Sequence, residues 1–392
     1  METIEFRKFT IKKGYIETTV TTSKFLTKQK DIIKFGLNKK IIPNSDLIAV
    51  ALSTLCGTQY KNIYMDLLVS TEALEGIKKF TQANVTVKGE NLSPPTYKNG
   101  TNNIILNFSG GFDSLAALCI MPDNTKLVSI DFGHWFTREK EIFSKFAPYT
   151  VKTNFRQLKY DRASWTFMGA GAILYSEYLG AGYQVFGTNL ESTPWNYISP
   201  DRINKSVLVP PFSIANIKDI KYIQGLALPS IIMIISRYRP DLLNESLKSL
   251  SEPGTEKRYR KEIVAKFICK KYNRNVFIES TEPPKQKVKF GSYLTADFIT
   301  LYQLKYLGKE VTERTICDIP KDVEDVVSKL KLAFYEKINT NFLETIPCQY
   351  KDEFHAKLAN ADVYPYNEQD WEEFREVIKL LSKYHTSITN VI

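Results

Sequence analysis

The chain has 392 residues, of which 43% are hydrophobic and 24% charged, as in an ordinary folded globular protein rather than a disordered or fibrous one. Its formal net charge of +10 favours contact with anions such as ATP, RNA or an acidic protein surface. The five cysteines are widely separated and only three histidines are present. Four clustered ligands for a structural zinc ion are therefore not expected.

Scattered cysteines are typical of a reducing compartment, and the first residues lack the basic-then-apolar layout of a signal peptide. The longest apolar stretch, at 226–235, contains a proline and falls short of the roughly 18 residues that a membrane-spanning helix needs. We therefore expect a cytoplasmic protein with no membrane partner. The sequence does not indicate an oligomeric state.

Residues 1–98 are predicted to form a small α+β domain. Alternating strands at 4–10 and 15–22 would form a hairpin that turns at 12–14, and a cap at Asn44 predicts a helix that ends near residue 55. A strand at 63–70, a helix at 71–81 and a short strand at 85–87 follow. The composition of 93–100 is that of a linker, so the first domain boundary is predicted there.

Residues 99–240 alternate between strand and helix patterns. Strands are predicted at 104–108, 126–133, 149–154 and 183–189, with helices at 138–146 and 165–179 and another that begins at Asp113. This alternation predicts an α/β core with a parallel sheet and helices on both faces. Ligands of such sheets bind beyond the carboxyl ends of the strands.

Residues 241–392 are predicted to form a helical C-terminal region. Helices are expected at 240–250, 255–272, 293–307, 321–338, 351–360 and 368–384.

The most informative segment is a glycine-rich turn between the first core strand and its helix. It reads Ser109, Gly110, Gly111, Phe112, Asp113, Ser114. Adjacent glycines let the backbone turn sharply, and the following helix N-terminus favours an anion such as phosphate. A carboxylate in a phosphate-binding loop is tolerable when it holds a cation, so Asp113 indicates Mg²⁺. A tight turn without a ligand is the alternative.

The pattern Ser-Gly-Gly-x-Asp-Ser resembles the signature of the PP-loop ATP pyrophosphatase superfamily, whose core has the HUP type of α/β fold. The Phe-Gly-Thr-Asn turn at 186–189 and the Pro-Pro-Phe segment at 210–212 resemble 7-cyano-7-deazaguanine synthase-like proteins. The chain lacks the zinc cysteines of those synthases. The resemblance covers about residues 101–240.

The resemblance implies ATP and Mg²⁺ as cofactors and assigns residues to them. Pyrophosphate would contact Ser109, Gly110, Gly111 and Ser114 within the loop that also contains Phe112. Asp113 would act with Mg²⁺, and Ser109 and Ser114 would join it in catalysis. Asp131 and Phe132 would lie by the ribose or adenine, and Gly187 and Thr188 near the α-phosphate.

The activity that the resemblance implies is an ATP-dependent ligase reaction. ATP is split between its α- and β-phosphates, and AMP activates a carboxylate, amide or carbonyl oxygen for attack by a nitrogen or sulfur nucleophile. The acceptor is not identified, and the partner alternatives are an RNA and a protein. Two alternatives stay open: a PP-loop enzyme that modifies tRNA, and a nucleotide-binding module without turnover.

A basic cluster follows the core. On a helix, Lys257 and Lys261 would share one face with Arg258 nearby, either as a clamp on ATP or RNA phosphates or as a solvated face. Two long irregular stretches, 156–165 and 190–206, are expected beside the crevice as lids or substrate contacts. His134 is expected at the same edge of the sheet, more plausibly as a structural residue than as a catalyst.

Overall fold

The computed structural model describes residues 2–24, 27–91, 102–133, 137–198 and 200–390. The chain forms two compact units that interleave along the sequence. The sheet unit comprises residues 1–109, 124–186 and 207–220, and the helical unit comprises 110–123, 187–206 and 221–392. The predicted linker at 93–100 lies outside the described residues, so the predicted three-domain division stays a prediction.

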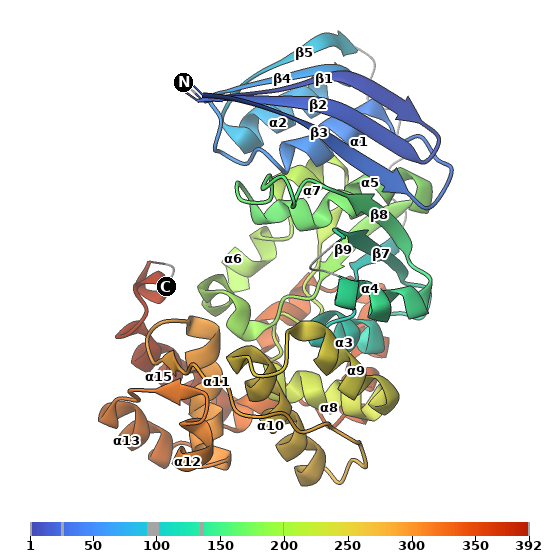
Figure 1. The fold of residues 1–392 in the computed structure, drawn as a ribbon. Coiled ribbons are helices and arrows are strands. Elements are labelled where there is room, and N and C mark those ends of the chain that lie inside the picture. Colours follow the sequence, from blue (N-terminus) through green and yellow to red (C-terminus); the bar gives the residue numbers. More distant parts are fainter. Residues whose placement is uncertain (1, 25–26, 92–101, 134–136, 199, 391–392) are drawn as a thin grey trace. The chain divides into compact units, whose positions relative to one another are not determined.

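A large mixed sheet dominates the sheet unit and confirms the α/β class (Figure 1). Its ten strands have the order β10-β9-β6-β7-β8-β3-β2-β1-β4-β5. They span Thr3–Lys12 (β1), Tyr15–Lys24 (β2), Thr27–Leu37 (β3), Asn62–Ser70 (β4), Asn84–Asn91 (β5), Asn103–Asn107 (β6), Lys126–Asp131 (β7), Tyr149–Thr153 (β8), Ala181–Phe186 (β9) and Lys218–Asp219 (β10).

The sheet is mixed rather than purely parallel because only two residues separate β1 from β2 and β2 from β3. β1, β2 and β3 are antiparallel neighbours, and Gly14 at the first turn has a φ of +79°. So short a connection can join only antiparallel strands. The strands β9, β6, β7 and β8 are parallel to one another. An antiparallel pairing of β3 with β8 joins the N-terminal strands to this parallel group. The predicted hairpin is confirmed, whereas β3 was not expected.

Four helices of the sheet unit pack on one another: α1 (Ser45–Ser53), α2 (Thr71–Thr81), α5 (Ala170–Leu179) and α7 (Pro210–Ile214). Local signals explain where two of them begin. The Asn44 side chain accepts a hydrogen bond from the Asp46 amide, and the Ser70 hydroxyl accepts one from Ala73. The unit also contains α4 (Thr137–Phe143) and the 3₁₀ segments η2 (Ser144–Phe146) and η3 (Trp165–Gly169).

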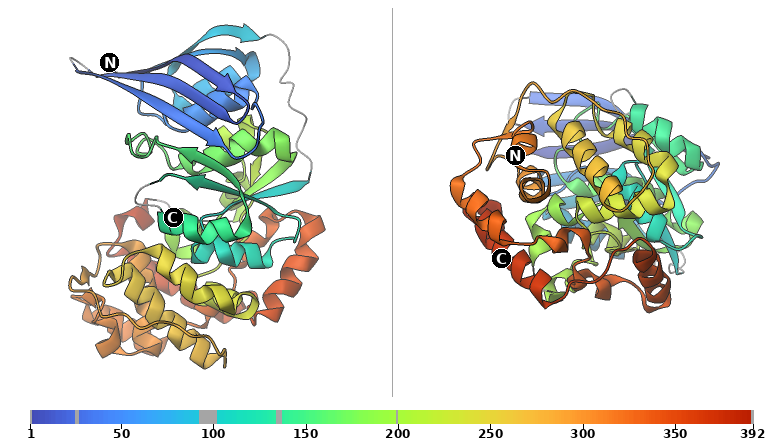
Figure 2. Two further views of the ribbon diagram at one scale, coloured as in Figure 1. Left: turned by 45° about the vertical axis from the view of Figure 1, so that its right-hand side comes forward. Right: turned by 90° about the horizontal axis from the view of Figure 1, so that it is seen from below.

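The helical unit confirms the helical C-terminal region (Figure 2). Its larger helices are α3 (Phe112–Ile120), α8 (Leu228–Tyr238), α9 (Pro240–Leu250), α10 (Glu256–Lys271), α11 (Leu294–Tyr306), α13 (Lys321–Lys329), α14 (Cys348–Asn360) and α15 (Glu368–Ser382). The smaller elements are α6 (Pro200–Lys205), α12 (Lys309–Thr312), α16 (Thr386–Thr389), the strand pair β11 (Val288–Lys289) and β12 (Ile316–Cys317), and η4 (Leu190–Ser192), η5 (Pro194–Tyr197), η6 (Ala333–Glu336) and η7 (Thr340–Thr345).

The predicted helix at 321–338 is wrong in its second half. α13 ends at Lys329, and the backbone of Leu332 has a φ of +57° that no right-handed helix contains. The Glu373 carboxylate accepts hydrogen bonds from the amides of Lys331 and Leu332 at 3.0 and 2.6 Å. A tertiary contact therefore supplies the partners that a continued helix would have supplied.

Within the described ranges, no helix is both long enough and apolar enough to cross a membrane. The apolar stretch at 226–235 contributes instead to α8, whose residues from Leu228 to Ser236 are all buried.

Candidate functional site

The carboxyl ends of three neighbouring parallel strands share one edge of the sheet. β9, β6 and β7 lie side by side in parallel register, and Ser109 follows β6 by two residues. Asp131 ends β7, where its carboxylate accepts hydrogen bonds from the Gly133 amide at 2.9 Å and from Lys140 at 2.7 Å. Asp131 is therefore already engaged by its own segment.

Phe132 lies in an aromatic cluster of the sheet unit. Its ring centroid is 5.4 Å from that of Phe155 and 6.1 Å from that of Phe167, and the residue is 7% exposed. Because Asp131 and Phe132 belong to the sheet unit and residues 110–114 to the helical unit, their predicted grouping around one nucleotide stays a prediction. His134 lies outside the described residues.

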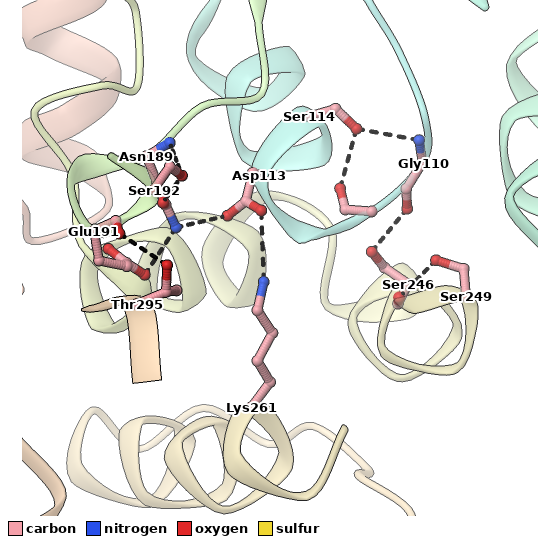
Figure 3. A network of polar contacts seen from close by, with 11 residues as sticks. Gly110, Asp113, Ser114, Asn189, Glu191, Ser192, Ser246, Ser249, Lys261 and Thr295 are labelled. Carbon is pink, nitrogen blue, oxygen red and sulfur yellow. Dashed lines mark hydrogen bonds and ion pairs between the residues drawn. The ribbon is translucent and has the colours of Figure 1, made fainter. Parts of the chain in front are cut away.

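The glycine-rich turn leads directly into α3. Gly110 has a φ of +80°, and Gly111 is the N-cap residue of α3 with an extended backbone and no side-chain cap. The Ser114 hydroxyl accepts a hydrogen bond from the Gly110 amide and donates one to the Gly111 carbonyl, both at 3.1 Å. A serine of the first helical turn thus holds the glycine turn closed (Figure 3). This local geometry is that of a helix N-terminus able to bind an anion.

A second glycine packs against the same helical turn. A Cβ atom on Gly187 would lie 2.8 Å from the Ser114 amide nitrogen and 3.1 Å from its Cα. Only glycine permits this approach without displacing one backbone from the other. The structure thereby brings together the predicted residues Gly187 and Ser114, while Thr188 follows as a half-buried residue.

Asp113 projects from the first turn of α3 and has two partners from distant parts of the sequence. Its Oδ1 accepts a hydrogen bond from Asn189 Nδ2 at 3.1 Å, and its Oδ2 lies 3.5 Å from the Lys261 ammonium (Figure 3). The Lys261 side chain is 7% exposed and that of Asp113 26%. A buried cation thus faces a carboxylate that solvent partly reaches.

Glu191 is a second acidic residue of this cluster, and sequence reasoning missed it. Asn189 Nδ2, which contacts Asp113, also donates to Glu191 Oε1 at 2.8 Å, so one amide joins the two carboxylates. Glu191 is 1% exposed, and its Oε2 has no hydrogen-bond partner in the described structure. Burial, and then the nearby charge of Asp113, raise the pKa of Glu191 to about 7.

The segment that carries Asn189 and Glu191 is tightly held. Asn189 and Ser192 cap η4 reciprocally, and Asn196 Nδ2 donates to the Asn189 carbonyl at 2.7 Å. Thr295 on α11 donates to the Glu191 carbonyl at 3.0 Å. The first part of the predicted irregular stretch at 190–206 is thus an ordered wall of the site.

α9 also contacts the glycine turn. Ser246 donates a hydrogen bond to the Gly110 carbonyl at 2.8 Å, and Ser249 donates to the Ser246 carbonyl at the same distance (Figure 3). No motif around Ser246 points to this contact, which depends on how α9 packs beside α3.

The predicted basic cluster lies on α10, but its residues do not share one environment. Lys257 is exposed, whereas Arg258 and Lys261 are 1% and 5% exposed. Lys257 and Lys261 are four residues apart on α10 and so follow one helix face as expected, but only Lys261 is buried where α10 packs against α8 and α9. A solvated face is also excluded for Arg258 and Lys261.

The buried cations of α10 are incompletely paired. Arg258 Nε and Nη1 and Arg260 Nη1 have no hydrogen-bond partner in the described structure. Arg260 pairs with Glu256 at 2.5 Å, and Lys261 lies 5.4 Å from the centroid of the Phe112 ring. Burial lowers the pKa of Arg258.

The acidic residues present fit a magnesium ion that is completed by phosphate and water. Mg²⁺ in nucleotide sites takes one or two carboxylates and fills its other positions with phosphate oxygens and water. Asp113 is partly exposed, and Glu191 one amide away keeps a buried oxygen without a partner. In the described part of the chain no group of three or more His, Cys, Asp or Glu residues forms a cage for a metal.

Comparison with protein-family models, curated proteins and solved structures gives no match to this chain. A functional assignment therefore depends on the geometry of this cluster and on the motif at 109–114.

Proposed function

We propose that the chain is an ATP pyrophosphatase-type enzyme with a PP-loop-like core, similar to 7-cyano-7-deazaguanine synthase. It binds ATP with Mg²⁺ and adenylates a carboxylate, amide or carbonyl oxygen, with release of pyrophosphate. A nitrogen or sulfur nucleophile then displaces AMP.

The observation that carries this proposal is the first turn of α3. Gly110 has the left-handed backbone that brings the chain into the helix, and no side chain caps the helix N-terminus. Asp113 occupies the same turn, where a carboxylate alone would repel phosphate. The amide donors can bind a phosphate while the neighbouring carboxylate binds a cation, so the two together suit a complex of a phosphate with a metal ion.

The surrounding residues supply the charge and rigidity that this complex requires. Lys261 places a buried positive charge next to Asp113, and Asn189 orients the carboxylate from the other side. Gly187 and Ser246 fix the backbone of the turn from two directions. Preorganised donors of this kind stabilise charge that develops on a leaving group. Bound Mg²⁺ would add neutralisation of the departing pyrophosphate.

Nucleotide binding tests the first half of the proposal. Titration calorimetry of ATP with and without Mg²⁺ is expected to show at least tenfold weaker Mg²⁺-dependent binding for Asp113→Asn than for the parent. The matched control is Asp352→Asn on the exposed side of α14. Equal Mg²⁺-dependent affinities of Asp113→Asn and the parent would refute a metal role for this carboxylate.

Product analysis tests the second half. The protein is incubated with ATP, Mg²⁺ and a panel of acceptors that includes small carboxylates, amides and tRNA, and nucleotides are separated by chromatography. AMP with pyrophosphate supports the proposed chemistry, and AMP only with tRNA favours the tRNA-modifying alternative. ADP assigns the protein to another enzyme class. ATP binding without any product favours the nucleotide-binding module.

A further inference from the structure

A polar cleft of about 550 Å³ opens in the sheet unit and is not part of the cluster around Asp113. Four segments form its walls: Glu2 before β1, the ends of β2 and β3, residues 55–60 after α1, and residues 157–162 after β8. Its volume lies within the range of about 300–1,000 Å³ that is usual for ligand pockets. The last segment is part of the long irregular stretch that the sequence singled out.

Positive charge prevails in this cleft. Lys28, Lys159 and Arg162 line it, and none of the three forms an ion pair with a carboxylate among the described residues. Lys24 also lines it and pairs with Glu2, the one acidic residue among the described lining residues. The charge thus points to an anionic ligand.

The cleft also contains neutral polar groups, among them the hydroxyls of Thr22 and Ser23 and the amide of Gln59. Thr27 and Gln157 also line it but donate to the carbonyls of Lys24 and Phe132, and Gln29 donates to Asp31. Neutral side chains of these types, together with Lys and Arg, make most protein contacts to nucleic-acid phosphates.

The positive charge continues outside the cleft along β3. Ile33 and Phe35 of this strand are buried, whereas Lys28, Lys30 and Lys34 point to the opposite, solvent-exposed face, where Lys34 also pairs with Glu17 of β2 at 3.5 Å. Alternate residues of a strand lie about 6.6 Å apart, so the row is about 20 Å long. Residues 1–40 contain ten lysine or arginine residues against four acidic residues. A row of this length exceeds what a mononucleotide contacts and matches a linear polyanion.

We propose that the cleft and the lysine row of β3 bind a single-stranded nucleic acid through its phosphates, with Lys28, Lys159 and Arg162 as the principal contacts. A positively charged groove that follows one backbone is the usual way in which proteins hold single strands. The surface consists of sheet-unit residues alone, so this binding does not depend on ATP chemistry at Asp113.

The test measures anisotropy of a fluorescein-labelled 20-nucleotide oligouridylate with the full chain at several salt concentrations. The cleft variant combines Lys28→Ser, Lys159→Asn and Arg162→Ser. Asparagine is chosen at position 159 because Lys159 has a φ of +65°, a conformation that asparagine tolerates. The control variant removes the same charge from exposed helices of the helical unit through Lys321→Ser, Lys329→Ser and Lys379→Ser.

The cleft variant is expected to bind the oligonucleotide at least tenfold more weakly, with the control within twofold of the parent. The slope of log K against log salt should become shallower by about 2, since each single-strand phosphate contact contributes roughly 0.7. Circular dichroism and ATP titration of both variants check that the fold and the Asp113 cluster are unchanged. If the cleft variant unfolds, Lys28→Ser with Arg162→Ser alone is used, with an expected change of about 1.4 in slope.

Three outcomes would overturn the proposal. Equal losses in the cleft and control variants would mean that net charge alone attracts the oligonucleotide. Full competition by UMP or inorganic phosphate at the oligonucleotide's own concentration would mean a small-molecule site. Polyglutamate binding as tightly as the oligonucleotide would favour an acidic protein partner.

Discussion

Glu191 gives a sharp test of the electrostatics of the site, because its carboxyl is buried beside another carboxylate. Burial and the Asp113 charge raise its pKa from an ordinary value of 4.5 to about 7. The folded protein therefore holds a proton there that the unfolded chain releases at lower pH. Folding stability from this group is greatest below pH 4.5, declines as the pH rises, and levels off above pH 7.

The substitution Glu191→Gln keeps the shape and the contact with Asn189 but removes the titration. A shift from 4.5 to about 7 corresponds to about 3 kcal/mol. Relative to the parent, the variant should therefore gain up to about 3 kcal/mol of unfolding free energy between pH 4.5 and pH 8. Urea unfolding with EDTA present, at half-unit pH steps, measures this difference.

The matched control is Glu372→Gln on the exposed face of α15, whose stability difference from the parent should be nearly constant with pH. A pH-independent difference for Glu191→Gln as well would refute the reasoning. It would mean that the Glu191 carboxyl is ionised throughout this range and that Lys261 or Arg260 compensates its burial.

Two further predictions concern the packing of the site. Gly187→Ala should destabilise the protein by about 1–3 kcal/mol and weaken ATP binding at least tenfold, because its Cβ would lie 2.8 Å from the Ser114 nitrogen. Urea unfolding and calorimetry check this against Gly36→Ala, whose nearest neighbours are 3.9 Å away. Arg258→Met should leave stability unchanged or raise it by about 1–4 kcal/mol, because it removes a buried charge without full pairing. If Arg258 binds a phosphate of ATP, the affinity for ATP falls in the same variant. A large loss of stability would show instead that the role of Arg258 is structural.

Helices and strands whose ends depend on nearby residues, such as a helix cap, were predictable from the sequence. The helix Thr71–Thr81 was predicted with its observed bounds because Ser70 caps it and its apolar residues recur with helical spacing. β3 escaped prediction because it begins with four exposed residues, from Thr27 to Lys30, that show no alternation. This segment forms a strand because it pairs with β2 and β8, and such pairing is not visible in a short window of sequence.

In the candidate site, too, the parts shaped by neighbouring residues were predictable and the parts that depend on distant contacts were not. The glycine turn and the start of α3 were predictable because the motif itself contains the residues that shape them. Asn189 belongs to the predicted turn at 186–189, although no contact with Asp113 was assigned to it, and Glu191 two residues further on was not singled out. Their roles arise from contacts with Asp113 across 76 residues of sequence. Side chains of common types acquire such roles only through tertiary packing.

The composition of α10 favours a bound anion. Its polar sequence predicts a solvated helix, yet Arg258, Arg260 and Lys261 are each at most 5% exposed. A buried charge without full pairing costs several kcal/mol, and Arg258 and Arg260 each keep at least one nitrogen without a hydrogen-bond partner in the described structure, so this helix is expected to gain something besides stability. Lys261 faces Asp113 in the turn where the motif predicts phosphate. An anion bound there would add negative charge next to Lys261, and the ligand-free protein would then be less stable than its complex with ATP and Mg²⁺.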